Sequence, residues 1–343
     1  MRKEQFSVGD LTVDVIRGGG LDPFTKRFYL DPVNGSDGND GLAITRAKKS
    51  FAAGYALLTT NKNEALYVLP GASASVITAE IDWTKSYTNL IGLGGPNNLA
   101  RGTRLTSLAY RGGCIISSTA VDVASVLHLT GDRNIFKGII FNNGGANAAC
   151  LNAVHLETGV GNTFLQCTMQ GINTTEQDIA TASSLDIGAN AHSPLFEDCI
   201  IGANTYTWTR TAVGGQLYFS NVTGGSNPQN GVFKGCRFLS KSDTAGVPMV
   251  HSALGTATVD RLWLFEDCLF DNFHTAGTDL TQVFLGQASG GMMHHFALRR
   301  CSAYGFAEWT QTDTEPDCMI RADMPITGLG GGLMRRPSGT YAA

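Results

Sequence analysis

The chain has 343 residues and a formal net charge of −4, so it carries no excess of positive charge for binding nucleic acid. No run of basic residues exceeds two, and no apolar stretch approaches the length of a membrane span. Hydrophobic residues make up 43% of the chain, which is enough for one sizeable core, and 42 glycines indicate many turns. The composition predicts neither a nucleic-acid nor a membrane partner.

Residues 1–27 are predicted to form an N-terminal arm. The segment 6–16 alternates apolar and polar residues as a strand does, and the glycines at 18–20 end it. The start of the chain lacks the apolar stretch that secretory signals contain, so we expect no signal peptide. The arm is predicted to anchor the protein to a partner through its apolar residues Phe6, Val8, Leu11, Val13 and Val15.

Residues 28–64 are predicted to contain a first strand, a loop rich in Gly and Asp, and an amphipathic helix at 47–58 that caps the core which follows. Oxygen-bearing side chains crowd the loop at Asp31, Asp37, Asn39 and Asp40. Such a loop can hold Ca²⁺, but Asx turns have the same composition and the spacing of an EF-hand is absent. We therefore predict no metal site and no cofactor.

Residues 65–305 contain a repeated pattern, apolar-x-x-Cys-x-apolar. The Cys position is predicted to fall at Gly138, Cys167, Cys199, Cys236, Cys268 and Cys301, in steps of 29, 32, 37, 32 and 33 residues. A period of this size indicates stacked structural units. A second short run with β-branched and aromatic residues lies upstream of each copy, so each repeat contains two strand signals in constant order.

Two strands per repeat predict an all-β solenoid, a parallel β-helix of about eight or nine coils. Successive coils then stack as neighbouring parallel strands, with equivalent side chains in ladders. The Cys ladder suits the core, because free Cys is a small, readily buried hydrophobe. Parallel side chains one strand apart fit disulfide geometry poorly, so all eight cysteines are predicted to be free thiols.

One position of the upstream strand is predicted to face outward in successive coils, because its neighbours along the strand are apolar. Three interpretations stay open for this ladder. It is a sugar-binding site, since aromatic rings stack on pyranose faces and polar groups bind hydroxyls, or a subunit contact, or plain surface. Its predicted members are His128, His155, Asp186, Tyr218, His251 and Phe284.

Two acidic pairs, Glu197–Asp198 and Glu266–Asp267, recur in the coil motif. Glycoside hydrolysis uses two carboxyl groups about 5–10 Å apart. These pairs are predicted to lie two coils apart with Lys234 between them, so we predict no catalytic residue and do not expect an enzyme. Trp208 lies in a polar insertion and is predicted to be an exposed contact.

Residues 306–343 are predicted to cover the last coil, which otherwise exposes unpaired backbone groups, and to end in a Gly-rich C-terminal arm. This arm is predicted to anchor the protein to a partner through Leu333, Met334, Arg335, Arg336 and Tyr341.

The coil motif resembles the signature of right-handed parallel β-helix proteins of the pectate-lyase-like superfamily. The segment from Phe28 to Gly71 is also similar to the first strand, loop, capping helix and first coil of that family. The resemblance covers residues 28–305 and implies a right-handed parallel β-helix with an N-terminal capping helix and extended terminal arms. Fold does not fix function, because this fold hosts lyases, hydrolases, adhesins and phage spikes.

With its two arms and no signal peptide, the whole chain resembles β-helix proteins of tailed-phage virions. The resemblance implies a homotrimer on the capsid exterior, with the major capsid protein or another virion protein as partner. A capsid decoration, or cement, protein is favoured, because the solenoid is short and no acidic catalytic cluster is visible. The alternative is a tailspike that recognises a host surface polysaccharide, with or without cleaving it.

Overall fold

The computed structural model describes residues 24–71, 74–94, 113–118, 123–203, 206–209, 214–220, 228–242, 244–252, 259, 261–273, 279–285 and 294–309, and the backbone of two later strands, Cys318–Ala322 and Leu333–Met334. Within this part of the chain, no helix combines the length and hydrophobicity that crossing a membrane requires.

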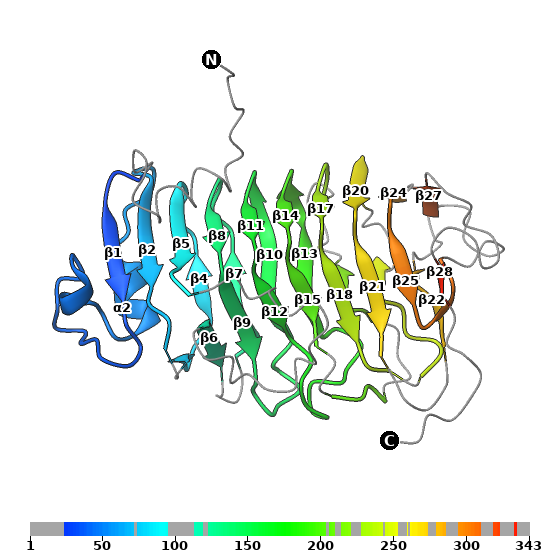
Figure 1. Ribbon diagram of the computed structural model, residues 1–343, viewed down its shortest axis with the longest axis horizontal. Coiled ribbons are helices and arrows are strands. Elements are labelled where there is room, and N and C mark those ends of the chain that lie inside the picture. Colours follow the sequence, from blue (N-terminus) through cyan, green and yellow to red (C-terminus); the bar gives the residue numbers. More distant parts are fainter. Residues whose placement is uncertain are drawn as a thin grey trace, which may run out of the picture.

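The chain winds into coils that stack along the long axis of the molecule, from β1 at the blue end to β27 at the red end (Figure 1). Strands of successive coils pair in parallel and form three long sheets, here called A, B and C. The predicted parallel β-helix is therefore confirmed.

Sheet A consists of β1 (Arg27–Leu30), β2 (Glu64–Val68), β5 (Thr88–Gly92), β8 (Ile135–Lys137), β11 (Thr163–Leu165), β14 (Leu195–Glu197), β17 (Val232–Lys234), β20 (Leu262–Glu266), β24 (His294–Arg299) and β27 (Cys318–Ala322). Sheet B consists of β3 (Ser75–Ile77), β6 (Cys114–Ser118), β9 (Ile139–Asn143), β12 (Thr168–Gln170), β15 (Ile200–Gly202), β18 (Arg237–Ser240), β21 (Leu269–Asn272), β25 (Ser302–Tyr304) and β28 (Leu333–Met334). Sheet C consists of β4 (Ile81–Trp83), β7 (Ser125–Leu129), β10 (Asn152–Val160), β13 (Ser183–His192), β16 (Leu217–Phe219), β19 (Val250–Ser252) and β23 (Phe284–Leu285). Strands β22 (Leu280–Gln282) and β26 (Phe306–Glu308) form a separate pair.

A short helix, α2 (Phe51–Ala56), lies at the β1 end of the stack (Figure 1) and follows the 3-10 turn η1 (Ile44–Arg46). Ser50 caps it, because its side chain accepts a hydrogen bond from the backbone N–H of Ala53. Phe51 is buried, and its ring lies 6.1 Å from that of Trp83. The predicted helix at the start of the core is present, but it is shorter than the range 47–58.

The Cys position of the coils forms one buried ladder whose members are Cys114, Ile139, Cys167, Cys199, Cys236, Cys268 and Cys301. The prediction that Gly138 takes this position is wrong. Phe136, rather than Ile135, pairs with Phe164, so Ile139 stands beside Cys167. Seven cysteines have described side chains, and all seven are free and buried as predicted.

Gly138 instead occupies the turn between sheets A and B, in the left-handed conformation with φ of 65°. The equivalent residue of every later coil is also left-handed, and these residues are Gln166, Asp198, Gly235, Asp267 and Arg300. Each thiol then lies within 3.2–3.4 Å of the Phe carbonyl oxygen in the preceding coil, from Cys167 at Phe136 to Cys301 at Phe265. One left-handed residue therefore turns the chain between the two sheets and aims the thiol along the stack.

A second inward ladder consists of stacked phenylalanines, Phe136, Phe164, Phe196, Phe233 and Phe265. Their ring centroids are 4.6–5.0 Å apart with interplanar angles of 8–13°. These rings share one core with the Cys ladder. The stack follows from the parallel register, because one side-chain type at one position repeats at the strand spacing of about 4.8 Å.

Trp208 belongs to a smaller core outside the main one. It packs with Ile172, Ala182 and Val247 and is fully buried. The prediction that Trp208 is an exposed contact is wrong. The polar residues around it in the sequence concealed an apolar cluster that forms beside sheet B.

We predict that Phe196→Ala lowers the free energy of unfolding by about 3–5 kcal/mol, because it removes one ring from the middle of the stack and leaves a cavity. Equilibrium denaturation measures the change. The control is Leu195→Ala, on the outer face of the same strand, which should cost about 1 kcal/mol or less. Equal losses in both variants would contradict a core organised by the Phe stack.

Candidate functional site

Sheet C brings together five of the six residues predicted for the outward ladder. His128 pairs with His155, His155 with Asp186, Asp186 with Tyr218, and Tyr218 with His251. Each lies between inward-facing neighbours in its strand, as Leu127 and Leu129 flank His128. The ladder itself is therefore present, whereas a binding role for it stays a prediction.

The prediction that Phe284 is the sixth member of the ladder is wrong. Phe284 pairs with Val250 and is fully buried, and Leu285 takes the position beside His251. Strand β23 contains only two residues, and the predicted alignment of its sequence with the other strands of sheet C was displaced by one residue. A shift of one residue moves a side chain to the other face of a sheet, so Phe284 lies in the core.

The first member of the ladder, Asp82, was not predicted from the sequence. It stands directly beside His128 although the two residues are 46 positions apart in the sequence. Its strand, β4, carries no Cys motif and lies in a longer coil, so the repeat could not reveal it. The ladder that the structure forms consists of Asp82, His128, His155, Asp186, Tyr218, His251 and Leu285.

The outward ladder is shielded rather than fully exposed. The side chain of His128 is 20% exposed, that of His155 is 23% exposed and that of Asp186 is 9% exposed. His251 is also buried, and Tyr218 is partly buried. Planar rings lie close to one another along it, with 5.1 Å between His128 and His155 and 5.2 Å between Tyr218 and His251.

Asp186 lies at the centre of the ladder in an unfavourable setting for a charge. Burial raises the pKa of its carboxyl group, although the neighbouring His155 opposes this shift. Nε2 of His155 is 3.6 Å from Oδ2 of Asp186, which is too long for a hydrogen bond. Oδ1 of Asp186 and Nε2 of His155 are both buried without a hydrogen-bond partner in the described structure. Burial and the charge of Asp186 also raise the pKa of Tyr218.

At the start of the ladder, His128 lies among carboxylates. Its Nδ1 is 2.8 Å from Asp82 Oδ1, and its Nε2 is 2.7 Å from Glu157 Oε2. Burial lowers the pKa of His128, but the hydrogen bonds to Asp82 and Glu157 and the charge of Glu80 outweigh it, and the pKa is raised overall. Glu80, Asp82 and His128 form the one group among the described residues with atoms placed to hold a metal ion.

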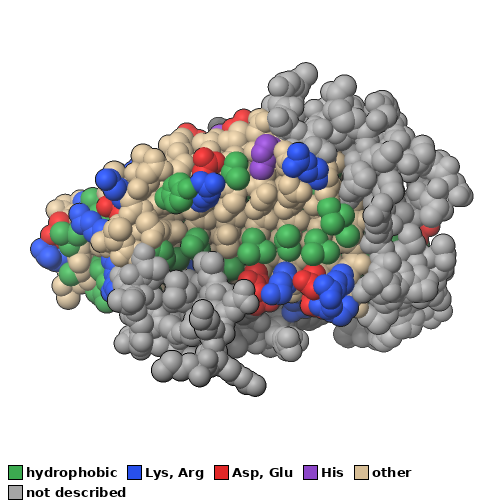
Figure 2. Space-filling model, turned by 90° about the horizontal axis from the view of Figure 1, so that it is seen from above, with side chains coloured by type: hydrophobic (Ala, Val, Ile, Leu, Met, Phe, Trp, Pro, Cys, Tyr) green, Lys and Arg blue, Asp and Glu red, His purple; other side chains and the backbone are tan. Residues whose placement is uncertain are grey.

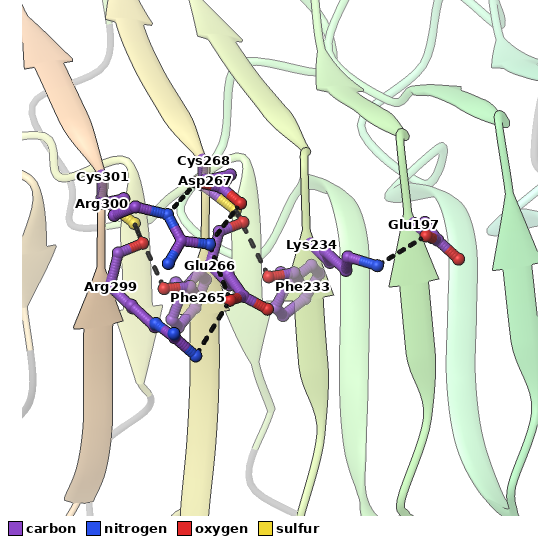
Figure 3. Close-up of polar contacts among 10 residues, drawn as sticks. All are labelled: Glu197, Phe233, Lys234, Phe265, Glu266, Asp267, Cys268, Arg299, Arg300 and Cys301. Carbon is purple, nitrogen blue, oxygen red and sulfur yellow. Dashed lines mark hydrogen bonds and ion pairs between the residues drawn. The ribbon is translucent and has the colours of Figure 1, made fainter.

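The acidic pairs of the coil motif lie where strands of sheet A end, with Glu197 and Glu266 in the strands and Asp198 and Asp267 in the turns that follow. Glu197, Lys234, Glu266 and Arg299 occupy one row in register (Figure 3). Ion pairs join Lys234 to Glu197 at 3.0 Å and Arg299 to Glu266 at 3.2 Å. Figure 2 shows acidic and basic side chains alternating beside a row of hydrophobic ones on this face. Lys234 and Arg299 therefore offset the charges of Glu197 and Glu266, and the expectation that these acids are not catalytic stays a prediction.

In the Gly/Asp loop near the N-terminal end, the Asp side chains accept hydrogen bonds from backbone N–H groups. Asp31 accepts hydrogen bonds from the N–H groups of Val33 and Asn34, and Asp37 accepts them from Lys49 and Ser50. Asp40 accepts one from the N–H of Leu42 and pairs with Arg46. The contacts of Asp31 and Asp40 with backbone groups two or three residues further on are turn contacts, as the Asx interpretation expects. Asp37 instead ties the loop to the residues just before α2.

The predicted anchoring arms are largely outside the described residues. Phe6, Val8, Leu11, Val13, Val15, Arg335, Arg336 and Tyr341 all lie there. Leu333 and Met334 form β28, which pairs with Ala303 and Tyr304 of β25. These two residues extend sheet B by one strand, and their role in anchoring stays a prediction.

We predict that Asp186→Asn raises the melting temperature at pH 7 by a few degrees and gives no gain below about pH 3.8, the ordinary pKa of Asp. A raised folded-state pKa means that stability falls as the pH rises, because the carboxyl then ionises in a buried site near the charge of Glu157. Thermal unfolding from pH 3 to 8 measures this. Asp267→Asn is the opposite control, because its hydrogen bond to Arg300 lowers the pKa of Asp267. A loss of stability in Asp186→Asn at pH 7 would refute the prediction.

Comparison with known proteins shows the fold of the chain. No protein-family model matches it, and no curated protein matches it. Among solved structures, pectate lyase Pel9A aligns with a TM-score of 0.52 and 12% identity, over 94% of this chain and 80% of that one. The pectin methylesterase of Aspergillus niger aligns with a TM-score of 0.52 and 11% identity, over 94% of this chain and 89% of that one. At such low identity the likeness shows the fold alone, and it confirms the right-handed parallel β-helix.

Proposed function

We propose that the protein is a virion β-helix protein that binds a polysaccharide of the host surface along sheet C. One observation carries this proposal. Ring-bearing and acidic side chains occupy a single outward row over successive coils, and the rings of His128, His155 and Tyr218 keep part of their surface exposed. Rings that keep part of their surface exposed at successive coils can contact successive sugars of an extended chain.

The chemistry of the row suits a carbohydrate. Tyr218 and His155 offer planar rings against which the apolar face of a pyranose packs, and Asp186 offers a carboxylate between them. An extended chain of sugars running along the stack meets one such group at every coil, about 4.8 Å apart. Many weak contacts in series then add up to useful affinity.

The class of ligand has further support. The two aligned structures are a pectate lyase and a pectin methylesterase, and their names indicate polysaccharide partners for those proteins of the same fold. The virion setting rests on the resemblance of the sequence to phage β-helix proteins. The sequence favours decoration because it lacks a visible acidic cluster, yet Glu80, Asp82 and Glu157 meet around His128. This weakens the argument against a receptor-binding role.

A trimeric capsid decoration protein is the second candidate, and the outer face of sheet A favours it. Hydrophobic side chains of Leu195, Val232 and Leu264 lie in register there and are partly exposed, next to Leu262, which is 46% exposed. The alternating ion pairs flank this row (Figure 2). A flat apolar stripe with a charged rim fits a contact with another copy or with the major capsid protein.

We predict that Tyr218→Ala and His155→Ala each weaken binding to the polysaccharide by about tenfold or more, since each removes a ring from the row. Binding is measured by titration with bacterial lipopolysaccharides and capsular polysaccharides that an initial array identifies. The control is Lys234→Ala on sheet A, which should bind unchanged. No binding to any polysaccharide, or equal weakening in the control, would contradict the proposal.

The number of copies per particle separates the two candidates. We expect a few to a few tens of copies for a receptor-binding tail protein, as determined by quantitative mass spectrometry of purified virions against the major capsid protein. A ratio near one copy per capsid subunit, or one per few, would instead establish the decoration protein and remove the tail assignment.

A further inference from the structure

We propose that Glu80, Asp82 and His128 form a binding site for a divalent transition-metal ion such as Zn²⁺ or Mn²⁺. The site lies on the outer face of sheet C, where β4 and β7 pair. It is independent of the proposed function, because the same three side chains would hold the ion whether or not a polysaccharide binds further along the ladder.

The geometry of the three side chains is close to that of a metal centre. Nδ1 of His128 lies 2.8 Å from Asp82 Oδ1 and 3.4 Å from Glu80 Oε1, and all three atoms lie within 4.8 Å of one another. Ligand atoms bound to Zn²⁺ at about 2.0–2.2 Å are about 3.0–3.5 Å apart in tetrahedral or octahedral arrangement. Small side-chain movements therefore suffice to admit an ion between them.

The cluster also contains the supporting contacts that metal-bound histidines have. Nε2 of His128 is 2.7 Å from Glu157 Oε2, so in a metal-bound ring the hydrogen on Nε2 would be donated to this carboxylate. The ion would then take the place of the proton that Nδ1 shares with Asp82. The ring of His155 stacks on that of His128 at 5.1 Å, which fixes its plane. Glu80 is held as well, because its Oε2 accepts a hydrogen bond from the N–H of Ser125.

The charge of the cluster favours a divalent cation. Glu80, Asp82 and Glu157 are three carboxylates around one imidazole, and in the described part of the chain His128 is the one basic side chain within ion-pair distance of them. A proton on His128 offsets one negative charge of the three. A divalent ion at Nδ1 offsets two and leaves the hydrogen bond to Glu157 in place.

The donor set indicates which ions fit. One imidazole nitrogen with two carboxylates suits Zn²⁺, Mn²⁺ and similar ions, whereas Ca²⁺ prefers six to eight oxygen ligands. The Asp82 side chain is 67% exposed, so solvent reaches the remaining coordination positions. Water, or an oxygen of a bound ligand, would complete the sphere.

A protonated His128 held between the carboxylates would make the same contacts without a metal. The two alternatives differ in a titration of the full chain, stripped with EDTA and dialysed at pH 7.5. We expect ZnCl₂ or MnCl₂ to bind at one ion per chain in calorimetry, and more tightly than CaCl₂. Co²⁺ should give visible d–d absorption typical of oxygen and nitrogen ligands. Absence of saturable binding, tighter binding of Ca²⁺, or a thiolate-to-cobalt charge-transfer band would overturn the proposal.

Variants identify the ligands. Asp82→Asn, Glu80→Gln and His128→Gln should each weaken Zn²⁺ binding about a hundredfold, and Glu157→Gln about tenfold, because it acts through His128. Glu197→Gln, which removes a carboxylate from sheet A, is the matched control and should bind as the parent does. Asp82 is the safest position for folding because it is exposed. Unchanged Zn²⁺ affinity in folded Asp82→Asn and Glu80→Gln would refute the site.

Discussion

The parallel register between coils is the constraint on which the rest of the structure depends. Each coil stacks on the last as neighbouring strands of a parallel sheet, so every side-chain position recurs at about 4.8 Å along the molecule. Each side chain must therefore pack against the equivalent side chains of the adjacent coils as well as against its neighbours in sequence. In the core, this requirement is met by the stacked Phe rings and the Cys ladder, because small or planar side chains can repeat at this spacing without leaving voids.

The same register has two different results on the outside. On sheet A, successive coils alternate in charge, so Glu197, Lys234, Glu266 and Arg299 neutralise one another. On sheet C, the ladder instead gathers three carboxylates around His128 and buries Asp186 beside His155. The charges of sheet C are therefore less evenly balanced than those of sheet A, because one imidazole stands among three carboxylates. The proposed polysaccharide row and the proposed metal site both lie on this less balanced sheet.

The sequence was most informative where the signal is local. The Cys motif spans six residues and correctly predicted the coils and the buried thiols. The short run upstream of it correctly predicted five members of the sheet C ladder. The prediction failed where alignment depended on very short strands, as with Phe284 in β23 and Gly138 before β9. The contact between Asp82 and His128 could not be predicted from the sequence, because the lengths of the loops between them decide whether residues 46 positions apart become neighbours. Trp208 was misplaced because polar neighbours in sequence do not reveal a second core.

The alternating charges of sheet A also bear on how such a solenoid can change its length. Deleting the single coil that contains Lys234 would bring Glu197 directly against Glu266, whereas deleting that coil and the next would bring Glu197 against Arg299. The same rule applies to added coils, because it depends on whether their number is odd or even. Along this face, growth or shortening by two coils preserves the attraction between neighbours, and a change by one reverses it.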